Sequence, residues 1–394
     1  MSGNKKIIHF LSASDRINYG DLLFPIIFKK VLEIYKIEAE FYNYGIVKSD
    51  LSHFGALPTK SYRSFTRNVK RYGGNIVIGG GEVLFVDWNS LLAYISYRFS
   101  RLLKRKPYNR IFYRIPLVQF LFSRGRIFIP FAPNKNRIRK NNVKTFYNAV
   151  GGSFENTKIK NQDLKIKKDL QSADYISVRD RRALKSLFDN NISSVLSPDS
   201  ALILSDLYSK DKLNKKSSIQ YIDGNYLFFQ VGIFHLPSDL NLLNKHLMEI
   251  SEKLKLKIVL CPIGKANRHE DHVALNKLKK LNSDFELVYP ESIFDIMNLI
   301  ANSSVYLGSS LHGLITAQSF SIPFFGIHSR QIKMKSYCET WASINNLIEI
   351  NEINNLIEIL KRWDKASFER KLKEQKIKVY SNFESIFDVM ESYE

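Results

Sequence analysis

The sequence predicts an α/β protein made of two doubly wound domains with a helical C-terminal tail. Short apolar runs of strand length alternate with segments of helical period along most of the 394 residues, a pattern typical of βα units and mainly parallel sheets. The chain also exceeds the usual size of one hydrophobic core, which favours two domains of roughly 150–200 residues each. A polar stretch near residues 205–224 interrupts the alternation, which then restarts.

The first half of the chain, residues 1–210, is expected to form the N-terminal domain. A helix is expected over 22–36, after a loop at 17–21, because its apolar residues fall on one face. The expected strands are short apolar runs bounded by turn residues, at 6–13, 39–44, 75–78, 126–133, 174–178 and 194–197.

The second half repeats the pattern, and residues 220–350 are expected to form the C-terminal domain. Its strand candidates are 226–234, 256–264, 284–290, 304–308 and 322–327, with helices near 239–254, 270–281, 291–301 and 312–320. Residues 351–394 are expected to be helical to the end. Two Rossmann-like domains followed by a helical tail suggest a GT-B-like arrangement, in which ligands bind between facing carboxyl ends of strands.

Cysteine content and hydropathy exclude several classes of protein. Only two cysteines occur, Cys261 and Cys338, and neither lies in a disulfide-framework or metal-binding spacing, so we expect no metal site. The first 15 residues lack the apolar core of a signal peptide, and no window reaches the ~18 apolar residues that would span a bilayer. We therefore expect a cytoplasmic protein.

The net charge of +21 is concentrated in one segment. No Asp or Glu lies between Asp87 and Glu155, whereas fourteen Lys or Arg do. Within the basic segment 90–127, residues 91–105 read as one amphipathic helix with a basic face. This helix places Leu91, Leu92, Ile95, Phe99, Leu102 and Leu103 opposite Arg98, Arg101, Lys104 and Arg105.

Such a segment suits an anionic membrane surface, an acidic polymer or nucleic acid, and it is also compatible with a helix that merely solvates its charges. No RNP1 or GXXG signature accompanies it. We expect no nucleic-acid partner and a protein that can lie peripherally at the inner face of the plasma membrane.

Residues that follow the strands of the N-terminal half are candidates for lining a cleft. Asn18, Gly20 and Asp21 follow the first strand, where Asp21 could instead cap the next helix. Three glycines, Gly79, Gly80 and Gly81, follow a later strand and would let the backbone approach a ligand. Their pattern is not the GxGxxG fingerprint of dinucleotide sites.

Arg179 and Asp199 follow two further strands. A guanidinium at the carboxyl end of a strand can bind a carboxylate or a phosphate through two hydrogen bonds. A structural ion pair of Arg179 with Asp180 or Asp199 is the alternative.

The stretch VYLGSSLHGLITAQSF at 305–320 predicts a strand that turns into a helix beginning near Leu311. Ser309 and Ser310 would cap this helix, and His312 and Gly313 would lie in its first turn. A helix N-terminus offers free N–H groups and a positive dipole end, so an anion is the expected ligand. His312 is therefore a candidate phosphate ligand or general acid, although a lone histidine in a helix can also be purely structural.

After the next strand, the loop IHSRQIKMK carries Arg330, Lys333 and Lys335. The ends of neighbouring parallel strands lie ~5 Å apart, so these cations can reach the same crevice as His312.

The ordered motifs NYGD, GGG, SVRD, SPD and SSLHG, followed by a lysine-bearing loop, resemble the polysaccharide pyruvyl transferase family over about residues 10–340. This resemblance implies transfer of an enolpyruvyl-derived unit from phosphoenolpyruvate to a sugar, which then carries a pyruvate ketal. It implies that Arg179 and His312 bind the donor and that Asp21 and Gly79 to Gly81 line the opposite wall. Many members have arginine where this chain has Ser310, so Arg330, Lys333 or Lys335 would have to supply that charge.

The chemistry implied by the resemblance needs no cofactor beyond phosphoenolpyruvate as co-substrate. A carboxylate and a phosphate call for fixed cations or helix ends rather than a metal, and His312 could deliver a proton. The base for the sugar hydroxyl is left open among Asp21, Asp87 and Asp199. The acceptor is expected to be a sugar of a surface polysaccharide, with a lipid-linked precursor as the form that a membrane-bound enzyme would meet.

Two other functions fit parts of the sequence. A GT-B glycosyltransferase that uses a nucleotide sugar would share the architecture, but the pair of glutamates eight positions apart that retaining members often carry does not appear around Glu291 or Glu339. A non-catalytic binder of an acidic polymer or membrane would explain the charge alone.

Overall fold

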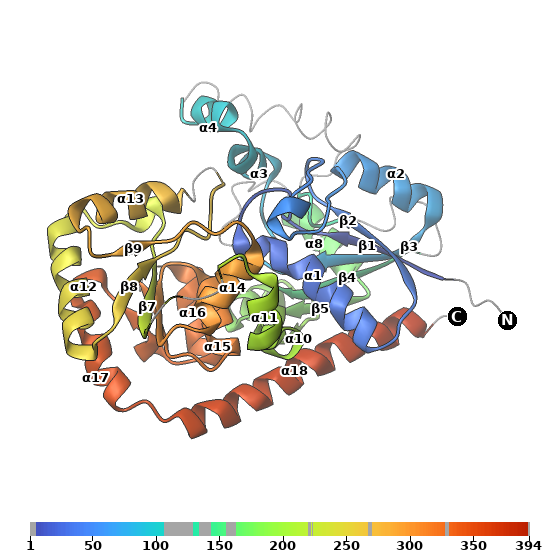
Figure 1. Ribbon diagram of the computed structural model, residues 1–394. Helices are drawn as coiled ribbons and strands as arrows, with labels where there is room; N and C mark the ends of the chain where they lie inside the picture. The colour runs from blue at the N-terminus through green and yellow to red at the C-terminus, as the bar shows by residue number, and fades with distance from the viewer. Residues whose placement is uncertain are drawn as a thin grey trace.

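The computed structural model describes residues 5–105, 129–133, 143–154, 163–219, 222, 224–266, 270–327 and 331–392. These residues form two parallel β-sheets, each flanked by helices, in the two-domain GT-B-like architecture that the sequence predicts (Figure 1). The strands are largely buried; all residues of β7 (Tyr226–Gln230) and β10 (Val305–Gly308), for example, are buried. Strands that are apolar throughout need cover on both faces, which only a helix-flanked parallel sheet supplies.

The first sheet has the strand order β2-β1-β3-β4-β5-β6, and all its neighbouring strands are parallel. Its strands are β1 (Lys6–Leu11), β2 (Ala39–Tyr44), β3 (Gly74–Gly79), β4 (Val143–Val150), β5 (Tyr175–Val178) and β6 (Val195–Leu196). The helices of this half are α1 (Tyr19–Ile34), α2 (Tyr62–Tyr72), α3 (Trp88–Ile95), α4 (Tyr97–Leu103), α8 (Asp163–Gln171), α9 (Arg181–Phe188), α10 (Leu204–Leu207) and α11 (Lys210–Lys216), with 3₁₀ turns η1 (Ser52–Phe54) and η3 (Ser200–Ile203).

The second sheet has the order β12-β11-β10-β7-β8-β9, again with parallel neighbours. Its strands are β7 (Tyr226–Gln230), β8 (Lys257–Leu260), β9 (Glu286–Leu287), β10 (Val305–Gly308), β11 (Phe324–Ile327) and β12 (Leu347–Ile348). The helices are α12 (Leu240–Leu254), α13 (Asp271–Leu281), α14 (Ile293–Ala301), α15 (Leu311–Ser319), α16 (Ile332–Trp341), α17 (Leu356–Lys361) and α18 (Lys365–Glu391), with 3₁₀ turns η4 (Ile233–His235), η5 (Ile344–Asn346) and η6 (Ile350–Asn355).

Helix α18 starts beside the second sheet and returns along both domains to the first sheet (Figure 1). Its far end is fixed there by hydrogen bonds from Tyr175 Oη to Asn382 Oδ1 (2.9 Å) and from Lys144 Nζ to the Val389 carbonyl (2.6 Å). Phe383 packs on Phe28 of α1, with ring centroids 5.7 Å apart. The C-terminal helix therefore straps the two domains together.

The domains also touch directly near the N-termini of α1 and α15. Tyr19 Oη lies 3.0 Å from Thr316 Oγ1, and the Tyr19 backbone N–H donates to the Ile263 carbonyl. One hydrophobic cluster continues from the first domain into the second. Because these contacts are buried, the facing edges of the two sheets are held in a defined relation.

Two sequence-based expectations about elements are wrong. In place of a strand over 126–133, Ile129–Pro133 form a turn, and residues 126–128 lie outside the described part. The expected helix over 91–105 is interrupted at Ser96, whose backbone is extended and whose Oγ accepts a hydrogen bond from Phe99 N. A serine that satisfies the next helix in this way competes with continuing the previous one. Leu102 is consequently 38% exposed.

Strand β4 was missed. Its sequence VKTFYNAV carries Lys144, Thr145 and Asn148 among the apolar residues, so it does not read as an apolar run, although it lies in the middle of the first sheet. Among the described residues, no helix has the length and apolar character needed to cross a membrane.

Candidate active site

A cavity of about 650 Å³ lies between the domains, at the carboxyl ends of their strands. Both domains contribute polar side chains to its wall. From the first domain these are Arg16, Asn18, Asp21, Glu82, Lys104 and Arg179, and from the second they are Gln230, His235, Asp271, Ser309, Ser310, His312 and Lys333. A ligand-sized cavity at this position is where open α/β sheets bind their ligands.

His312 enters the cavity from the first turn of α15, as expected. Ser310 caps this helix, with its Oγ accepting a hydrogen bond from Gly313 N. The imidazole packs edge-on against Phe24, with centroids 5.1 Å apart, and its side chain is 13% exposed. His312 therefore has a fixed orientation and access to the cavity.

Gly20 makes this position of His312 possible. A Cβ atom on residue 20 would lie 1.9 Å from His312 Nδ1, so the imidazole of the second domain rests directly on the backbone of α1. The sequence placed Gly20 on the cleft wall; in the structure its role is to admit the histidine.

Arg179 is buried, with 1% of its side chain exposed, and it is surrounded by carboxylates. Its guanidinium donates to Asp199 Oδ2 at 3.1 Å and to Glu82 Oε2 at 2.9 Å. Glu82 also accepts from Arg182. Arg179 therefore forms the structural ion pair with Asp199 that was the alternative, and it also lines the cavity, where a ligand could reach it.

Asp199 connects Arg179 to His312, because its Oδ2 also lies 3.6 Å from His312 Nε2. Burial would raise the pKa of Asp199, but His312, Arg179 and the Ala201 N–H together hold this pKa below its ordinary value. Burial likewise opposes ionisation of Glu82, yet Arg179, Arg182 and Lys333 lower its pKa. Both carboxylates are therefore charged, and they compensate the buried cations.

Lys333 comes from α16 and is half-buried at the same cavity. Burial lowers its pKa, and the nearby Arg179 adds to this effect, whereas Glu82 and Asp21 oppose it. An ammonium group in such a place gains from any further anion, so Lys333 is well placed to bind a negatively charged ligand.

Asp21 lies in the first turn of α1 and does not cap it; the N-cap residue is Asn18. Asn18 Nδ2 donates to Asp21 Oδ2 at 2.7 Å, which fixes the carboxylate at the cavity wall. Of the three glycines, only Gly81 lines the cavity. Gly79 and Gly80 instead leave space for the rings of Phe10 and Phe24. A Cβ atom added at Gly79 would lie 1.9 Å from Phe10, and one added at Gly80 would lie 2.0 Å from Phe24.

The remaining predicted donor residues are spread more widely. Ser309 lines the cavity and accepts a hydrogen bond from Gly232 N. Leu311 also lines it, whereas Gly313 packs on Tyr306, whose Oη would lie 2.2 Å from an added Cβ. Lys335 is half-exposed on α16, outside the cavity wall, 3.9 Å from Glu339. Arg330 lies outside the described residues.

Sequence reasoning missed several cavity residues, of which Glu82 and Asp271 are the most informative. Glu82 directly follows the glycines at the end of β3, and this adjacency was the available signal. Asp271 lies in the stretch RHEDH, which reads as an exposed helix start and not as a metal site. Asp271 does begin α13, but it is buried rather than exposed. Its Oδ2 accepts hydrogen bonds from Gln230 Nε2 and from the N–H groups of Ile263 and Gly264.

Burial raises the pKa of Asp271 to about 7, against the opposing effect of these hydrogen bonds. Between about pH 4 and pH 7 the folded chain then holds a proton that the unfolded chain has lost, so this group makes folding less favourable as pH rises. Asp271→Asn cannot ionise. Between these limits the wild type should lose up to roughly 4 kcal/mol of unfolding free energy that Asp271→Asn does not lose.

Urea denaturation at several pH values measures this difference. Asp239→Asn is a matched control, because Asp239 caps an exposed helix start elsewhere in the second domain. Parallel pH profiles for wild type and Asp271→Asn would show that Asp271 is not protonated in the folded chain.

Comparison with solved structures places the fold in a known class. UDP-N-acetylglucosamine 2-epimerase from Rickettsia bellii is similar to the chain with a TM-score of 0.56 at 10% identity, covering 99% of this chain and 97% of that one. The enzyme from Methanocaldococcus jannaschii gives 0.53 at 14% identity, with 92% and 94% covered. The UDP-N-acetylglucosamine 2-epimerase from Neisseria meningitidis has a TM-score of 0.52 at 10% identity, covering 98% of this chain and 99% of that one. At these identities the likeness concerns the fold: two Rossmann-like domains that enclose a cleft.

The sequence itself assigns the chain more narrowly. The family model for polysaccharide pyruvyl transferase matches residues 18–329. This range contains all the residues that line the cavity except Ala13, Arg16 and Lys333. The chain therefore belongs to the polysaccharide pyruvyl transferase family, and the resemblance found in its motifs is confirmed. No curated protein sequence matched it.

Proposed function

We propose that this transferase moves a pyruvyl group from phosphoenolpyruvate to two hydroxyls of one sugar in a bacterial surface polysaccharide or its lipid-linked precursor. The products are a pyruvate ketal and inorganic phosphate. The main support is that His312, Lys333 and the start of α15 line the same cavity as Asp21. A proton donor and anion-binding groups thus face a carboxylate across the domain interface.

In this proposal the donor lies with its phosphate at the N-terminus of α15. The free N–H groups there and the ammonium of Lys333 bind the negative charge. Arg16 is only 8% exposed and lines the cavity. Its Nε lies 3.2 Å from Asp15 Oδ1, and its Nη2, which has no hydrogen-bond partner among the described residues, is left for the carboxylate of the donor. Arg179 holds Glu82 and Asp199 in place through its hydrogen bonds. Its positive charge also attracts the anionic donor.

The reaction needs one proton on the methylene carbon of the donor. His312 delivers it, and the central carbon becomes open to attack by the first sugar hydroxyl. Asp21 accepts the proton which that hydroxyl loses, and the second hydroxyl displaces phosphate and closes the ketal. In balance, two carbon–oxygen bonds and one carbon–hydrogen bond form, while the π bond of the donor and the bond from its central carbon to the bridging phosphate oxygen break. The second hydroxyl proton leaves with phosphate, and exchange with solvent returns the proton from Asp21 and restores the one on His312.

Burial and existing hydrogen bonds favour Asp21 as the base among the three aspartates that the sequence left open. Asp87 caps α3, accepting from Ser90 N at 2.8 Å, and is buried. Asp199 is engaged by Arg179 and His312. Asp21 alone of the three lines the cavity, and we assign the proton acceptance to it.

Incubation of the protein with phosphoenolpyruvate and candidate saccharides tests the proposal. Release of phosphate together with a saccharide heavier by the ketal is the expected result. A glycosyltransferase that uses a nucleotide sugar is the second candidate, since the Neisseria meningitidis structure with the same fold contains UDP-GlcNAc. Consumption of a nucleotide sugar, with no use of phosphoenolpyruvate, would overturn the first proposal in favour of the second.

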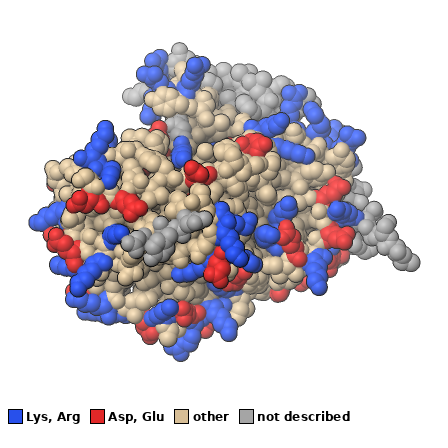
Figure 2. Space-filling model, in the orientation of Figure 1, with Lys and Arg blue, Asp and Glu red and all other residues tan. Residues whose placement is uncertain are grey.

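We also propose that the enzyme meets lipid-linked acceptors at an anionic membrane surface through α4. The exposed residues of this helix and of the turn after it include Tyr97, Arg98, Arg101, Leu102, Lys104 and Arg105. Lys and Arg side chains gather there at the top of the molecule in Figure 2. Lys104 also lines the cavity, so a membrane docked on α4 would lie beside the cleft. The described residues reach only Arg105 of the basic segment 90–127.

Charge reversal of Arg98, Arg101, Lys104 and Arg105 to glutamate should therefore abolish binding to phosphatidylserine vesicles. At about 1 kcal/mol for each basic residue, the partition constant should fall by roughly a factor of 1,000. Vesicle sedimentation measures it. Glutamate at Lys210, Lys212, Lys215 and Lys216 of α11 changes the net charge equally and should have a much smaller effect; equal losses would mean that only net charge matters.

A further inference from the structure

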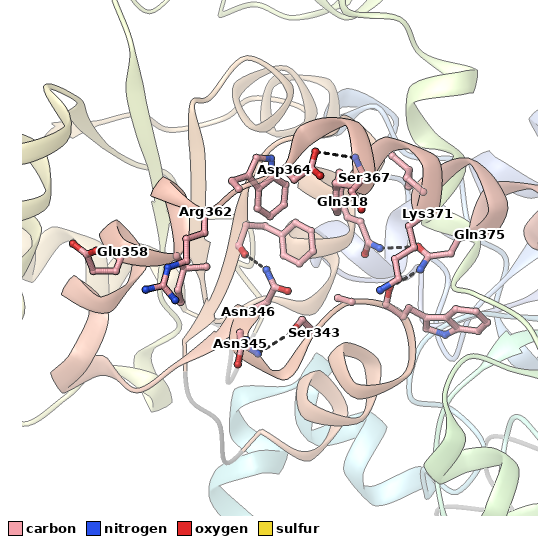
Figure 3. A pocket seen from close by; sticks show the side chains of 17 residues that line it. Gln318, Ser343, Asn345, Asn346, Glu358, Arg362, Asp364, Ser367, Lys371 and Gln375 are labelled. Carbon is pink, nitrogen blue, oxygen red and sulfur yellow. Dashed lines mark hydrogen bonds between the residues drawn. The ribbon is translucent and has the colours of Figure 1, made fainter.

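A second cavity, of about 440 Å³, lies away from the cleft (Figure 3). Its wall includes Phe324, which begins β11, and Asn346, which precedes β12. The cavity is thus at the amino ends of these strands, at the edge of the second sheet opposite the candidate active site. The start of α18 forms another part of the wall.

Aromatic rings make the apolar part of this wall. Trp363 and Phe368 are partly exposed, and their ring centroids lie 4.8 Å apart at an interplanar angle of 40°. The fully buried Phe324 lies behind both, at 6.4 Å and 6.0 Å. These contacts keep the two accessible rings in fixed positions, which suits a ligand with a flat apolar face.

The polar part of the wall offers donors and acceptors with balanced charge. The side chains of Arg362 and Lys371 form no hydrogen bond or ion pair with any described residue, and the side-chain amide of Asn345 is equally free within that part of the chain. Two acidic residues, Glu358 and Asp364, line the same cavity. Asp364 already caps α18, accepting from Ser367 N at 3.0 Å, so the helix end is not open to an anion.

This combination separates the second cavity from the first. A phosphate or carboxylate ligand needs an excess of positive charge or a free helix end, and neither is present among the residues that line the cavity. A neutral saccharide presents an apolar face of C–H groups and an edge of hydroxyls, each of which both donates and accepts. Partly exposed rings beside free amide and guanidinium donors match it.

We propose that this cavity binds a neutral sugar unit of the polysaccharide, at a site separate from the cleft where the pyruvyl group is transferred. The proposal rests on the proposed function for the source of the sugar, but the binding itself does not require catalysis. The site lies where α18 leaves the second domain, so a bound sugar would touch both the strap and the domain body.

The wall is also linked to the candidate active site. Gln318 of α15, the helix that carries His312, donates to Gln375 Oε1 at 2.9 Å, and Gln375 in turn donates to the Trp341 carbonyl. Trp341 Nε1 donates to the carbonyl of Arg179 at 2.6 Å. Figure 3 shows Gln318 and Gln375 side by side at one end of the cavity.

Tryptophan fluorescence provides a direct test. Of the three tryptophans in the chain, Trp341 and Trp363 line this cavity, so Trp88→Phe leaves both remaining indoles at the site. Titration of this variant with lactose, cellobiose and methyl α-mannoside should change its emission saturably for at least one of them. Phosphoenolpyruvate should not compete.

Two further variants distinguish this cavity from the cleft. Arg362→Ala together with Asn345→Ala, in the Trp88→Phe background, should weaken binding by about tenfold or more, because hydrogen bonds to a charged donor and an amide are lost. Arg370→Ala, at an exposed position of α18 outside the cavity wall, should bind as its parent does. No saccharide response in the parent, or unchanged affinity in the double variant, overturns the proposal.

The outcome is separable from that of the proposed function. His312→Ala should retain the fluorescence response even where it has lost transfer. If the wild type binds saccharide at this cavity but transfers no pyruvyl group, the proposed function alone is wrong. If it transfers the pyruvyl group but binds no saccharide here, the present inference alone is wrong.

Discussion

Replacement of His312 by alanine is expected to lower turnover with phosphoenolpyruvate by about 10²- to 10⁴-fold, the usual contribution of a positioned general acid. The imidazole is held between Phe24, Asp199 and the backbone of Gly20, so no other side chain of the described cavity wall can take its position without rearrangement. Phosphate release under saturating donor and acceptor measures the effect. His246→Ala, a histidine of α12 outside the cavity wall, should keep wild-type turnover.

Gly20→Ala tests the same assignment from the other domain. The added Cβ would overlap His312 Nδ1, so the ring must move, and turnover should fall while His312 itself is retained. Circular dichroism and the melting temperature check that the fold survives. Full activity in both His312→Ala and Gly20→Ala would show that His312 takes no part in the reaction.

The fold was predictable because the patterns that encode it are local. The apolar runs at 226–234, 256–264 and 304–308 contain β7, β8 and β10, and the helical segments near 239–254 and 312–320 coincide with α12 and α15 to within a residue or two. Capping was equally local: Ser310 caps α15 as expected. Strand β4 was missed because its polar residues find partners elsewhere in the fold, such as Asn382 for Asn148.

The site was predictable only where a residue follows a strand. His312, Asp21, Arg179 and Lys333 all lie at the carboxyl ends of strands or in the helices that follow, and the structure brings them to one cavity. Partners across the cavity could not be predicted in this way, because the pairing of Arg179 with Glu82 joins residues 97 positions apart. The function of Gly20 depends in the same way on a histidine nearly 300 positions later.

Loss of Arg179 is expected to have the largest effect on stability. Arg179→Met leaves Asp199 and Glu82 without their shared cation, and Asp199 is fully buried. Removing one partner of a buried ion pair usually costs about 3–5 kcal/mol, because the remaining charge is uncompensated. Urea denaturation of the variant should show a loss of this size, whereas Arg181→Met, at the exposed neighbouring position, should change little.

The unfolding free energy lost in Arg179→Met should become smaller as pH falls. The pKa of Asp199 is lowered in the folded chain, in part by Arg179, so its ionised form contributes stability above its unfolded pKa, and that contribution disappears as pH falls. The gap between wild type and Arg179→Met should therefore be widest near neutral pH and should narrow in acid. Adding Glu82→Gln and Asp199→Asn to Arg179→Met should restore part of the stability, because the two carboxylates that accept hydrogen bonds from the guanidinium are then neutral. The buried Asp180, whose Oδ2 lies 3.9 Å from Arg179 Nε, stays charged in this variant and limits the recovery. If Arg179→Met instead unfolds as the wild type does and loses only donor binding, the guanidinium serves the ligand and not the carboxylate cluster.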